Sequence, residues 1–283
     1  MKLLRWGAKG EEKPGLVDKD GAARDLSGVI SDITPDLLSR EGLQRLAGID
    51  AAGLPKVPYA ARLGVPLTGI SKIVCVGLNY ADHAAETGAP IPKEPILFLK
   101  ALSALSGPND EIMMPRGSVK TDWEVELGVV IGSRTSYVGE QEALDHVAGY
   151  SVINDVSERE YQTERGGQWD KGKGCDSFAP VGPWLVTKDE IADPQDLKLW
   201  TEVNGVRRQN GSTRTMIFGV RTLVSYISHF MTLLPGDIIA TGTPPGVALG
   251  MKPPQYLKPG DRLRLSVEGL GEQNNVLVPW RRA

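Results

Sequence analysis

Short apolar segments separated by glycine and proline turns are the feature that most restricts the fold of this chain. Two of these turns have the same form, with Pro-Gly-Asp directly before an apolar segment, at residues 235–239 and 259–263. Proline restricts its own φ and glycine adopts positive φ, so such a pair makes a tight turn before a strand. The 33 glycines and 20 prolines among 283 residues therefore favour a mostly β fold with some helix over a helical bundle.

Several segments have the composition of buried strands. Each is an apolar run bounded by turn residues, which is typical of a strand with both faces covered. A further pair of strands is predicted around Asn204-Gly205, a sequence that favours a tight hairpin turn. The predicted strands are residues 72–77, 95–100, 123–131 and 147–153.

Helical signals are fewer. Residues 220–234 repeat apolar side chains at helical spacing, which predicts a helix, and residues 79–92 predict a loop or a short helix. Residues 1–68 contain short alternating segments and a proline-rich run, whereas dense strands begin after them. We therefore predict an α+β, mostly β fold, with a small N-terminal domain and linker at 1–68 and a larger domain at 69–283.

Composition also excludes some classes of protein. The net charge is −3, and basic residues are dispersed, so no nucleic-acid partner is expected. No apolar run approaches the roughly 20 residues that a membrane span needs, and the N-terminal residues lack the apolar core of a signal peptide. We expect a cytoplasmic protein without membrane association. Cys75 and Cys175 are too few for a disulfide framework or a cysteine-rich zinc site.

The predicted strand that begins near Trp123 carries two acidic residues of the same orientation. In an extended chain, Glu124 and Glu126 point to one side and Val125 to the other. Their Cα atoms would lie about 6.6 Å apart, so both carboxylates could bind one metal ion. A solvated strand face is the alternative interpretation, and for this spacing alone it is the more frequent one.

A third carboxylate strengthens the metal hypothesis. Asp155 ends another predicted strand, and three carboxylates without a His or Cys cluster suit Mg²⁺ or Mn²⁺. Ser157 and Glu160 have the spacing of a helix-capping box just after it. Arg159 and Lys173 could supply positive charge for an anionic substrate, although ordinary surface positions would explain them equally well.

Four motifs in this chain resemble successive signatures of the fumarylacetoacetate hydrolase family. Their order and spacing agree with that family over about residues 70–270. The motifs are Gly77-Leu78-Asn79-Tyr80-Ala81-Asp82-His83-Ala84-Ala85-Glu86, Asp122-Trp123-Glu124-Val125-Glu126-Leu127-Gly128, Asn154-Asp155-Val156-Ser157-Glu158-Arg159-Glu160 and Thr241-Gly242-Thr243-Pro244-Pro245-Gly246-Val247.

The resemblance implies a catalytic domain of coiled mixed β-sheets, a β-roll, behind a smaller N-terminal domain. It also implies a homodimer that acts on a small keto acid. On the matching positions it assigns Mg²⁺, or Mn²⁺, to Glu124, Glu126 and Asp155.

The resemblance further implies the catalytic and substrate-contacting residues. His83 and Glu86 match a catalytic dyad, whose i, i+3 spacing would let Glu86 orient the imidazole on a short helix. Lys173 matches the active-site lysine, although the nearby Lys171 leaves the register ambiguous. The substrate-contacting positions correspond to Arg159, Gln162 and Thr243. His146 and His229 match no such position, and we interpret both as structural.

The expected reaction is hydrolysis of a carbon–carbon bond in a 2,4-diketo acid, giving pyruvate and a carboxylic acid. The segments at 116–123 and 164–173 are similar to the subgroup that acts on 2,4-diketo-3-deoxy sugar acids from L-fuconate or L-rhamnonate, where the acid is L-lactate. Proteins of this kind are also labelled ureidoglycolate lyase. Decarboxylases, hydratases and isomerases of related 2-keto acids share the family's metal chemistry, so they remain alternatives.

Overall fold

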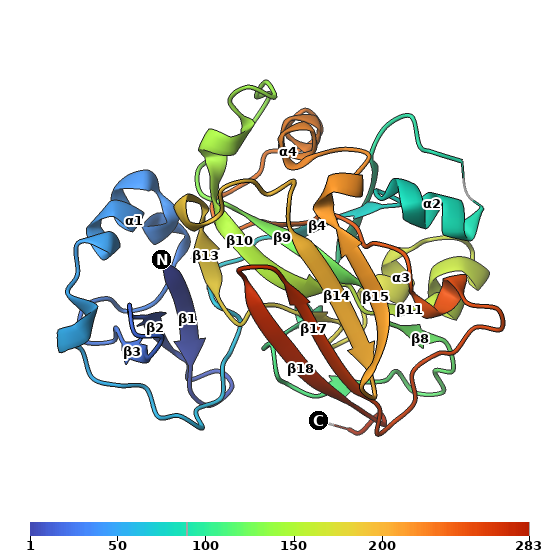
Figure 1. The fold of residues 1–283 in the computed structure, drawn as a ribbon, viewed down its shortest axis with the longest axis horizontal. Helices are drawn as coiled ribbons and strands as arrows, with labels where there is room; N and C mark the ends of the chain where they lie inside the picture. The colour runs from blue at the N-terminus through green and yellow to red at the C-terminus, as the bar shows by residue number, and fades with distance from the viewer. Residues whose placement is uncertain (89, 283) are drawn as a thin grey trace.

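Two β-sheets packed against each other form the centre of the molecule in a computed structural model, which describes residues 1–88 and 90–282 (Figure 1). The larger sheet has nine strands in the order β3-β2-β1-β13-β10-β9-β16-β4-β5. Its pairs are antiparallel except β16 with β4. The strands are β1 (Lys2–Trp6), β2 (Lys13–Val17), β3 (Ala23–Asp25), β4 (Ile73–Gly77), β5 (Ile96–Lys100), β9 (Val125–Ile131), β10 (Val147–Asn154), β13 (Leu185–Thr187) and β16 (Ile238–Ala240).

The smaller sheet has five strands in the order β15-β14-β17-β18-β7. They are β7 (Ile112–Met113), β14 (Lys198–Val203), β15 (Val206–Ser212), β17 (Arg262–Val267) and β18 (Gly271–Val278). Two short pairs complete the strands: β8 (Thr121–Asp122) with β11 (Ser157–Glu158), and β6 (Leu105–Ser106) with β12 (Ala179–Pro180).

The helices of the described residues are short and lie outside the sheets (Figure 1). The α-helices are α1 (Arg40–Ala47), α2 (Ala81–Thr87), α3 (Asp170–Lys173) and α4 (Val220–Ser228). Glu160–Glu164 forms one π-helical turn, labelled η5. The 3-10 turns are η1 (Pro35–Leu38), η2 (Ala51–Gly53), η3 (Leu102–Ala104), η4 (Ala143–His146), η6 (Lys188–Glu190), η7 (Thr213–Thr215) and η8 (Ala248–Gly250).

The predicted helix at 220–234 is too long, because α4 ends at Ser228. Leu233 instead exchanges two backbone hydrogen bonds with Thr135, each 2.9 Å long. These bonds need an extended backbone at Leu233, which a helix could not provide. The helical spacing of apolar residues therefore continues beyond Ser228, although the backbone there is not helical.

Local turn and strand signals are confirmed. Asn204 and Gly205 have φ values of 52° and 78° between β14 and β15, as a type I′ hairpin requires. The predicted apolar runs correspond to β4, β5, β9 and β10.

The fold is α+β and mostly β, as predicted. In the described chain, no helix combines the length and the apolar character that crossing a membrane requires.

Strand β9 is a central strand of the larger sheet, packs against the smaller sheet and is buried on both faces. Val125, Leu127 and Val129 pack in one apolar cluster with Leu199 of β14 and Leu265 of β17, all at most 1% exposed. Burying one such side chain contributes about 1.5–3 kcal/mol. Truncating Leu265 to Ala would therefore loosen the support of the strand that carries Glu126.

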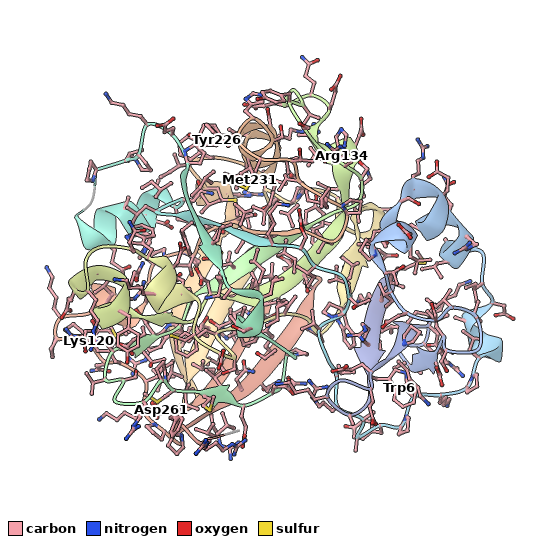
Figure 2. All side chains as sticks on the ribbon, turned by 180° about the vertical axis from the view of Figure 1, so that it is seen from behind. Trp6, Lys120, Arg134, Tyr226, Met231 and Asp261 are labelled. Atoms are coloured by element: carbon pink, nitrogen blue, oxygen red, sulfur yellow. The ribbon has the colours of Figure 1, made fainter. Side chains whose placement is uncertain are left out.

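The N-terminal lobe continues the larger sheet, because β1 pairs antiparallel with β13. Arg62 pairs with Glu12 inside this lobe and ties the lobe to the rest of the molecule through its ion pair with Asp110. Figure 2 shows Trp6 in this lobe and Lys120 at the other end of the molecule. The boundary at residue 68 remains a prediction.

Candidate active site

Three buried carboxylates meet where β9 and β10 lie side by side. Glu124 directly precedes β9, Glu126 lies on it, and Asp155 directly follows β10. The two strands are antiparallel, and the Asp155 amide donates to the Glu124 carbonyl at 2.9 Å. One oxygen from each carboxylate lies within 4.8 Å of the others, and the three residues are 6%, 1% and 0% exposed. Burial excludes the alternative of a solvated strand face.

Two cationic side chains that the sequence suggested lie against these carboxylates. The Lys173 Nζ donates to Glu124 Oε2 and to Asp155 Oδ2, both at 2.7 Å. The Arg159 guanidinium donates to the other Glu124 oxygen at 2.6 Å and to Gln162 Oε1 at 3.0 Å. Lys171, the other candidate lysine, instead donates to the exposed Arg165 carbonyl, so Lys173 is the lysine that reaches the cluster.

Sequence reasoning missed two charged residues of this cluster. Lys100, at the end of β5, is 3% exposed and donates to Asp155 Oδ1 at 2.6 Å. Asp122, which is fully buried, accepts from Arg159 Nε at 2.8 Å and from the backbone amides of Ala248 and Leu249. The sequence offers one signal for Lys100, which is its position at the end of an apolar run. A lysine in such a run is expected to be buried, and buried lysines are rare without a charged partner.

Burial and neighbouring charges shift the pKa values of the cluster in opposite directions. Burial raises the pKa of Glu124, but the charges of Lys173 and Arg159 outweigh it and bring the value down to about 2. Burial, with the charges of Asp155 and Glu124, holds the pKa of Glu126 well above its usual range. A divalent cation between these oxygens would lower the Glu126 pKa, so metal binding should release a proton.

His83 and Glu86 form a hydrogen-bonded pair on α2. The His83 Nδ1 lies 3.0 Å from Glu86 Oε2, and His83 is 7% exposed. The Gly246 amide donates to both Glu86 oxygens, at 3.0 and 3.2 Å. The loop after β16 thus fixes the carboxylate. In the tautomer with the proton on Nδ1, the imidazole donates to Glu86, and Nε2 is the nitrogen that can accept a proton.

The loop after β16 also reaches the carboxylates. The Gly242 amide donates to Glu126 Oε2 at 2.8 Å. The φ of this residue is 97°, a backbone conformation that glycine adopts and that residues with a side chain rarely do. The Thr243 hydroxyl donates to the Val125 carbonyl at 2.8 Å and accepts from the buried Gln209 amide at the same distance. Thr243 is thereby held beside the strand that carries Glu126.

The predicted capping box after Asp155 is wrong. Ser157 belongs to β11, and its hydroxyl donates to the Asp155 carbonyl at 2.9 Å instead of capping a helix. The π-helical turn begins only at Glu160, because β11 first pairs with β8. This arrangement still brings Arg159 and Gln162 together near the carboxylates, as expected.

The two remaining histidines lie elsewhere and have partners of their own. His146 Nδ1 is 2.8 Å from the Ser133 hydroxyl, and the His229 ring stacks on Tyr137 at 5.6 Å between centroids. These contacts agree with the structural interpretation. Cys175 is half-buried, and burial raises its pKa to about 11, which disfavours the thiolate that a nucleophile needs.

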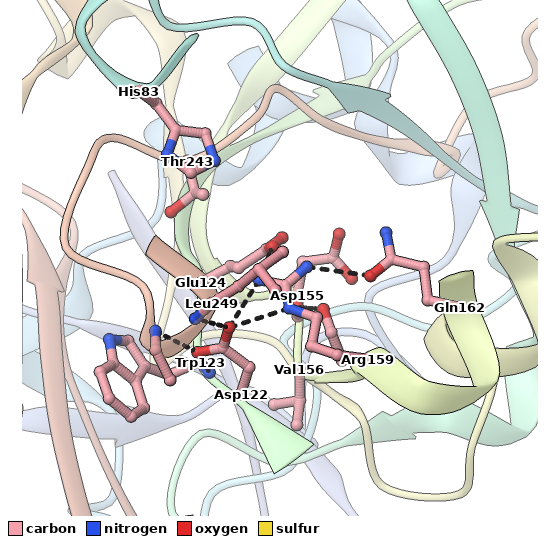
Figure 3. Close-up of polar contacts among 12 residues, drawn as sticks. His83, Asp122, Trp123, Glu124, Asp155, Val156, Arg159, Gln162, Thr243 and Leu249 are labelled. Carbon is pink, nitrogen blue, oxygen red and sulfur yellow. Dashed lines mark hydrogen bonds and ion pairs between the residues drawn. The ribbon is translucent and has the colours of Figure 1, made fainter. Parts of the chain in front are cut away.

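A cavity of about 200 Å³ opens onto the carboxylates. In Figure 3, His83 approaches it from α2, whereas Arg159 and Gln162 reach in from the segment after β11. Its volume lies below the 300–1,000 Å³ of most ligand pockets, which favours a small substrate. The lining residues are Val76, Gly77, Leu78, His83, Phe98, Glu124, Glu126, Arg159, Gln162, Thr163, Trp169, Lys173, Thr243 and Leu249.

Comparison with known proteins identifies the family. Residues 72–278 match the model of the fumarylacetoacetate (FAA) hydrolase C-terminal family, so this chain belongs to that family. A relative from Burkholderia multivorans, whose name specifies a hydrolase without a substrate, is 61% identical over 96% of this chain and 97% of its own.

Solved structures of related enzymes share the whole fold. A fumarylacetoacetate hydrolase from Exiguobacterium antarcticum is 38% identical, with a TM-score of 0.85 over 99% of this chain and 100% of its own. A 2-hydroxyhepta-2,4-diene-1,7-dioate isomerase from Mycobacterium marinum is 36% identical, with a TM-score of 0.78 over all of both chains. A maleylpyruvate hydrolase from Sphingobium, in complex with manganese(II) and pyruvate, is 29% identical, with a TM-score of 0.83 over 99% and 100%.

The three carboxylates fit a hard divalent cation. Mg²⁺ and Mn²⁺ prefer oxygen ligands, and Glu124, Glu126 and Asp155 bring together carboxylate oxygens without sulfur or imidazole donors. The Gly242 amide donates to Glu126, and the Lys173 ammonium donates to Glu124, so both orient these oxygens. Outer contacts of this kind are what metal sites use to fix their ligands.

Proposed function

We propose that this protein is a metal-dependent hydrolase that cleaves a 2,4-diketo acid into pyruvate and a carboxylic acid. The observation that carries the proposal is one small cavity lined by Glu124 and Glu126 of the carboxylate cluster, by Lys173 and by His83, which is paired with Glu86. A cation site, a base and an ammonium donor are the three groups this hydrolysis needs. Mg²⁺ or Mn²⁺ held by Glu124, Glu126 and Asp155 would supply Lewis-acid stabilisation of the negative charge on the 2-oxo oxygen.

His83 is suited to activate water. With Glu86 accepting from Nδ1–H, the Nε2 atom takes a proton from water, and the hydroxide adds to C4 of the substrate. Glu86 stabilises the imidazolium that results, and Gly246 keeps the carboxylate in place. The C3–C4 bond then breaks, its electron pair goes to C3, and the C4 fragment leaves as a carboxylic acid.

Lys173 is suited to the second half of the reaction. The released fragment is the enolate of pyruvate, and an ammonium group near it stabilises the charge and supplies the proton that C3 requires. Burial lowers the pKa of Lys173, but Asp155 and Glu124 outweigh burial and raise it, so the ammonium form is retained. Arg159, Gln162 and Thr243 would then hold the substrate oxygens.

Two further observations support a keto-acid substrate. The related maleylpyruvate hydrolase has manganese(II) and pyruvate bound, and pyruvate is the product expected here. The sequence likeness to the sugar-acid subgroup makes 2,4-diketo-3-deoxy-L-fuconate or its L-rhamnonate counterpart our preferred substrate, with L-lactate as the second product. The related isomerase favours isomerisation of a 2-hydroxy-dienoate as the second candidate function.

The test is to incubate the Mg²⁺- or Mn²⁺-loaded protein separately with 2,4-diketo-3-deoxy-L-fuconate, acylpyruvates, maleylpyruvate, oxaloacetate, ureidoglycolate and 2-hydroxyhepta-2,4-diene-1,7-dioate. Pyruvate, lactate, CO₂ and glyoxylate are each quantified, and the dienoate is followed by absorbance. We expect equal amounts of pyruvate and carboxylic acid from a diketo acid. Glyoxylate or CO₂ as the only product, or a dienoate shift without cleavage, would overturn the hydrolase assignment.

A further inference from the structure

We propose that the cavity selects 2,4-diketo acids whose acyl group is uncharged, and that Leu249 is the residue that determines this selectivity. The inference rests on the proposed hydrolase function and extends it to the class of substrate. It follows from the positions of the cationic groups around the cavity and from the side chains that form the rest of the wall.

The two cationic side chains of the lining are already paired. Arg159 binds Asp122 and Glu124, and Lys173 binds Glu124 and Asp155. Lys100, behind the wall, binds Asp155. Among the described lining residues, no other lysine or arginine is present to meet a second substrate carboxylate.

Charge balance leads to the same conclusion. The buried cluster contains four carboxylates and three cations, so its net charge is −1 when all are ionised. The carboxylates are Asp122, Glu124, Glu126 and Asp155, and the cations are Lys100, Arg159 and Lys173. A divalent ion changes this to +1, which one substrate carboxylate neutralises. A second carboxylate would restore a buried negative charge, which is costly without a partner. The partly exposed Glu86 adds to that repulsion.

The remaining wall is mainly apolar. Phe98 and Trp169 pack edge to face at 5.4 Å, and Leu78 and Leu249 continue the lining. Such a surface accommodates an alkyl or hydroxyalkyl group, and the donors it includes, the Trp169 indole N–H and the Thr163 hydroxyl, carry no positive charge to balance a carboxylate. L-Lactate as a product, from a hydroxyethyl acyl group, is compatible with this surface.

Leu249 holds a fixed position at the cavity. Its amide donates to Asp122 Oδ2 at 3.1 Å, and the same carboxylate accepts from Arg159, which contacts Glu124 (Figure 3). The Leu249 side chain lines the cavity and is still 42% exposed, so it lies at the mouth. A longer cationic side chain at this position would face the cavity without disturbing the buried cluster.

The experiment compares pentanoylpyruvate with succinylpyruvate, which has an acyl group of similar length that ends in a carboxylate. For the metal-loaded wild-type protein we expect kcat/KM to be at least about 100-fold higher for pentanoylpyruvate. Leu249→Arg should narrow this ratio at least 10-fold by raising kcat/KM for succinylpyruvate. A wild-type preference for succinylpyruvate, or an unchanged ratio in Leu249→Arg, would overturn the inference.

Two variants separate charge at the cavity from other effects. Leu249→Gln changes size and polarity without adding charge, and Val206→Arg adds the same charge at the exposed hairpin, outside the cavity lining. Neither should narrow the ratio, and narrowing by either contradicts a specific role of charge at residue 249.

Calorimetric binding of both diketo acids to the metal-loaded protein distinguishes failure of this inference from failure of the proposed function. If neither compound is cleaved but pentanoylpyruvate binds more tightly, the hydrolase assignment fails and the charge selectivity stands. If both are cleaved but succinylpyruvate binds more tightly, the charge selectivity fails and the hydrolase assignment stands. Absence of binding by both overturns the two together.

Discussion

The two sides of the cavity are built differently. On the carboxylate side, Glu126 and Asp155 lie at the junction of two central strands and are nearly or fully buried. On the other side, His83 lies on the seven-residue helix α2, which has no side-chain cap at its N-terminus. A helix this short is marginal without tertiary contacts. The Gly246 bonds to Glu86 supply such a contact.

This difference suggests a division of labour. The strand side holds charges in place before substrate binds, which a metal site requires. The helix side is a short helix held by side-chain hydrogen bonds to two segments, from Gly246 to Glu86 and from Thr215 to Asp82. Substitutions on the strand side should therefore change metal binding, and substitutions on α2 should change turnover alone.

The largest effect is expected for Glu126→Gln. It should abolish detectable turnover and weaken metal binding by more than the 10–100-fold typical of residues outside the ligand set. The folded, metal-free protein should lose little stability, because Glu126 lies among like charges and Gln can still accept from Gly242. Metal titration calorimetry and urea unfolding measure the two effects.

Glu158→Gln is the matched control for Glu126→Gln. Glu158 is also fully buried, but its carboxylate accepts from Ser118 and Thr121 and does not line the cavity. We expect this variant to retain metal affinity and turnover. Loss of metal binding in both variants would show that burial, and not membership of the carboxylate cluster, explains the result.

The second prediction concerns the helix side. His83→Ala should lower kcat by about 10²–10⁴-fold, the usual contribution of a general base, and leave metal affinity unchanged. Metal titration beside steady-state kinetics checks both halves of the prediction. Full hydrolysis by His83→Ala would remove the dyad from the mechanism, and a parallel loss of metal would erase the distinction between the two sides.

The elements that could be predicted from the sequence are those with local causes. Asn204-Gly205 forms its hairpin through its own φ preferences, and the Glu124 and Glu126 spacing follows from strand geometry. Lys100 and Asp122 were missed because their partners are distant in the chain: Lys100 bonds to a residue 55 positions away, and Asp122 to backbone amides 126 and 127 positions away. Only the folded topology brings such groups together.

The helix ends were mispredicted for a similar reason. Apolar periodicity continued beyond Ser228, but the backbone of Leu233 pairs with Thr135, almost 100 residues earlier. Ser157 had a capping sequence, yet β8 pairs with its backbone first. In both cases a long-range backbone contact was more favourable than a local helical preference.

The third prediction uses Lys100 to test how far the strand side depends on compensating charge. Lys100→Met leaves Asp155 with one cation fewer in a buried site, and breaking such a pair costs about 3–5 kcal/mol of unfolding free energy. A divalent ion should replace part of the missing charge. Metal should therefore raise the melting temperature of Lys100→Met more than that of the wild type, as measured by calorimetry. An equal or smaller rise would mean that Lys100 does not act through charge.

The smallest effect is expected for Arg62→Ala, which removes two partly exposed ion pairs, with Glu12 and Asp110, outside the cavity lining. Arg62 binds Asp110 with two bonds of 2.7 Å, but its side chain is 28% exposed. We therefore expect the free energy of unfolding to fall by about 1 kcal/mol, with no change in metal affinity.

The effect should depend on pH. Burial raises the pKa of Asp110, but the bonds and charge of Arg62 outweigh burial, so the pKa lies below its usual value. The stabilisation is therefore present above the unfolded pKa of about 3.9 and is lost as pH falls through the folded pKa. Urea unfolding of the two proteins should converge in acid. A pH-independent difference would assign the effect to lost packing instead of charge, and a change in metal affinity would show that the carboxylate side is not insulated from the N-terminal lobe.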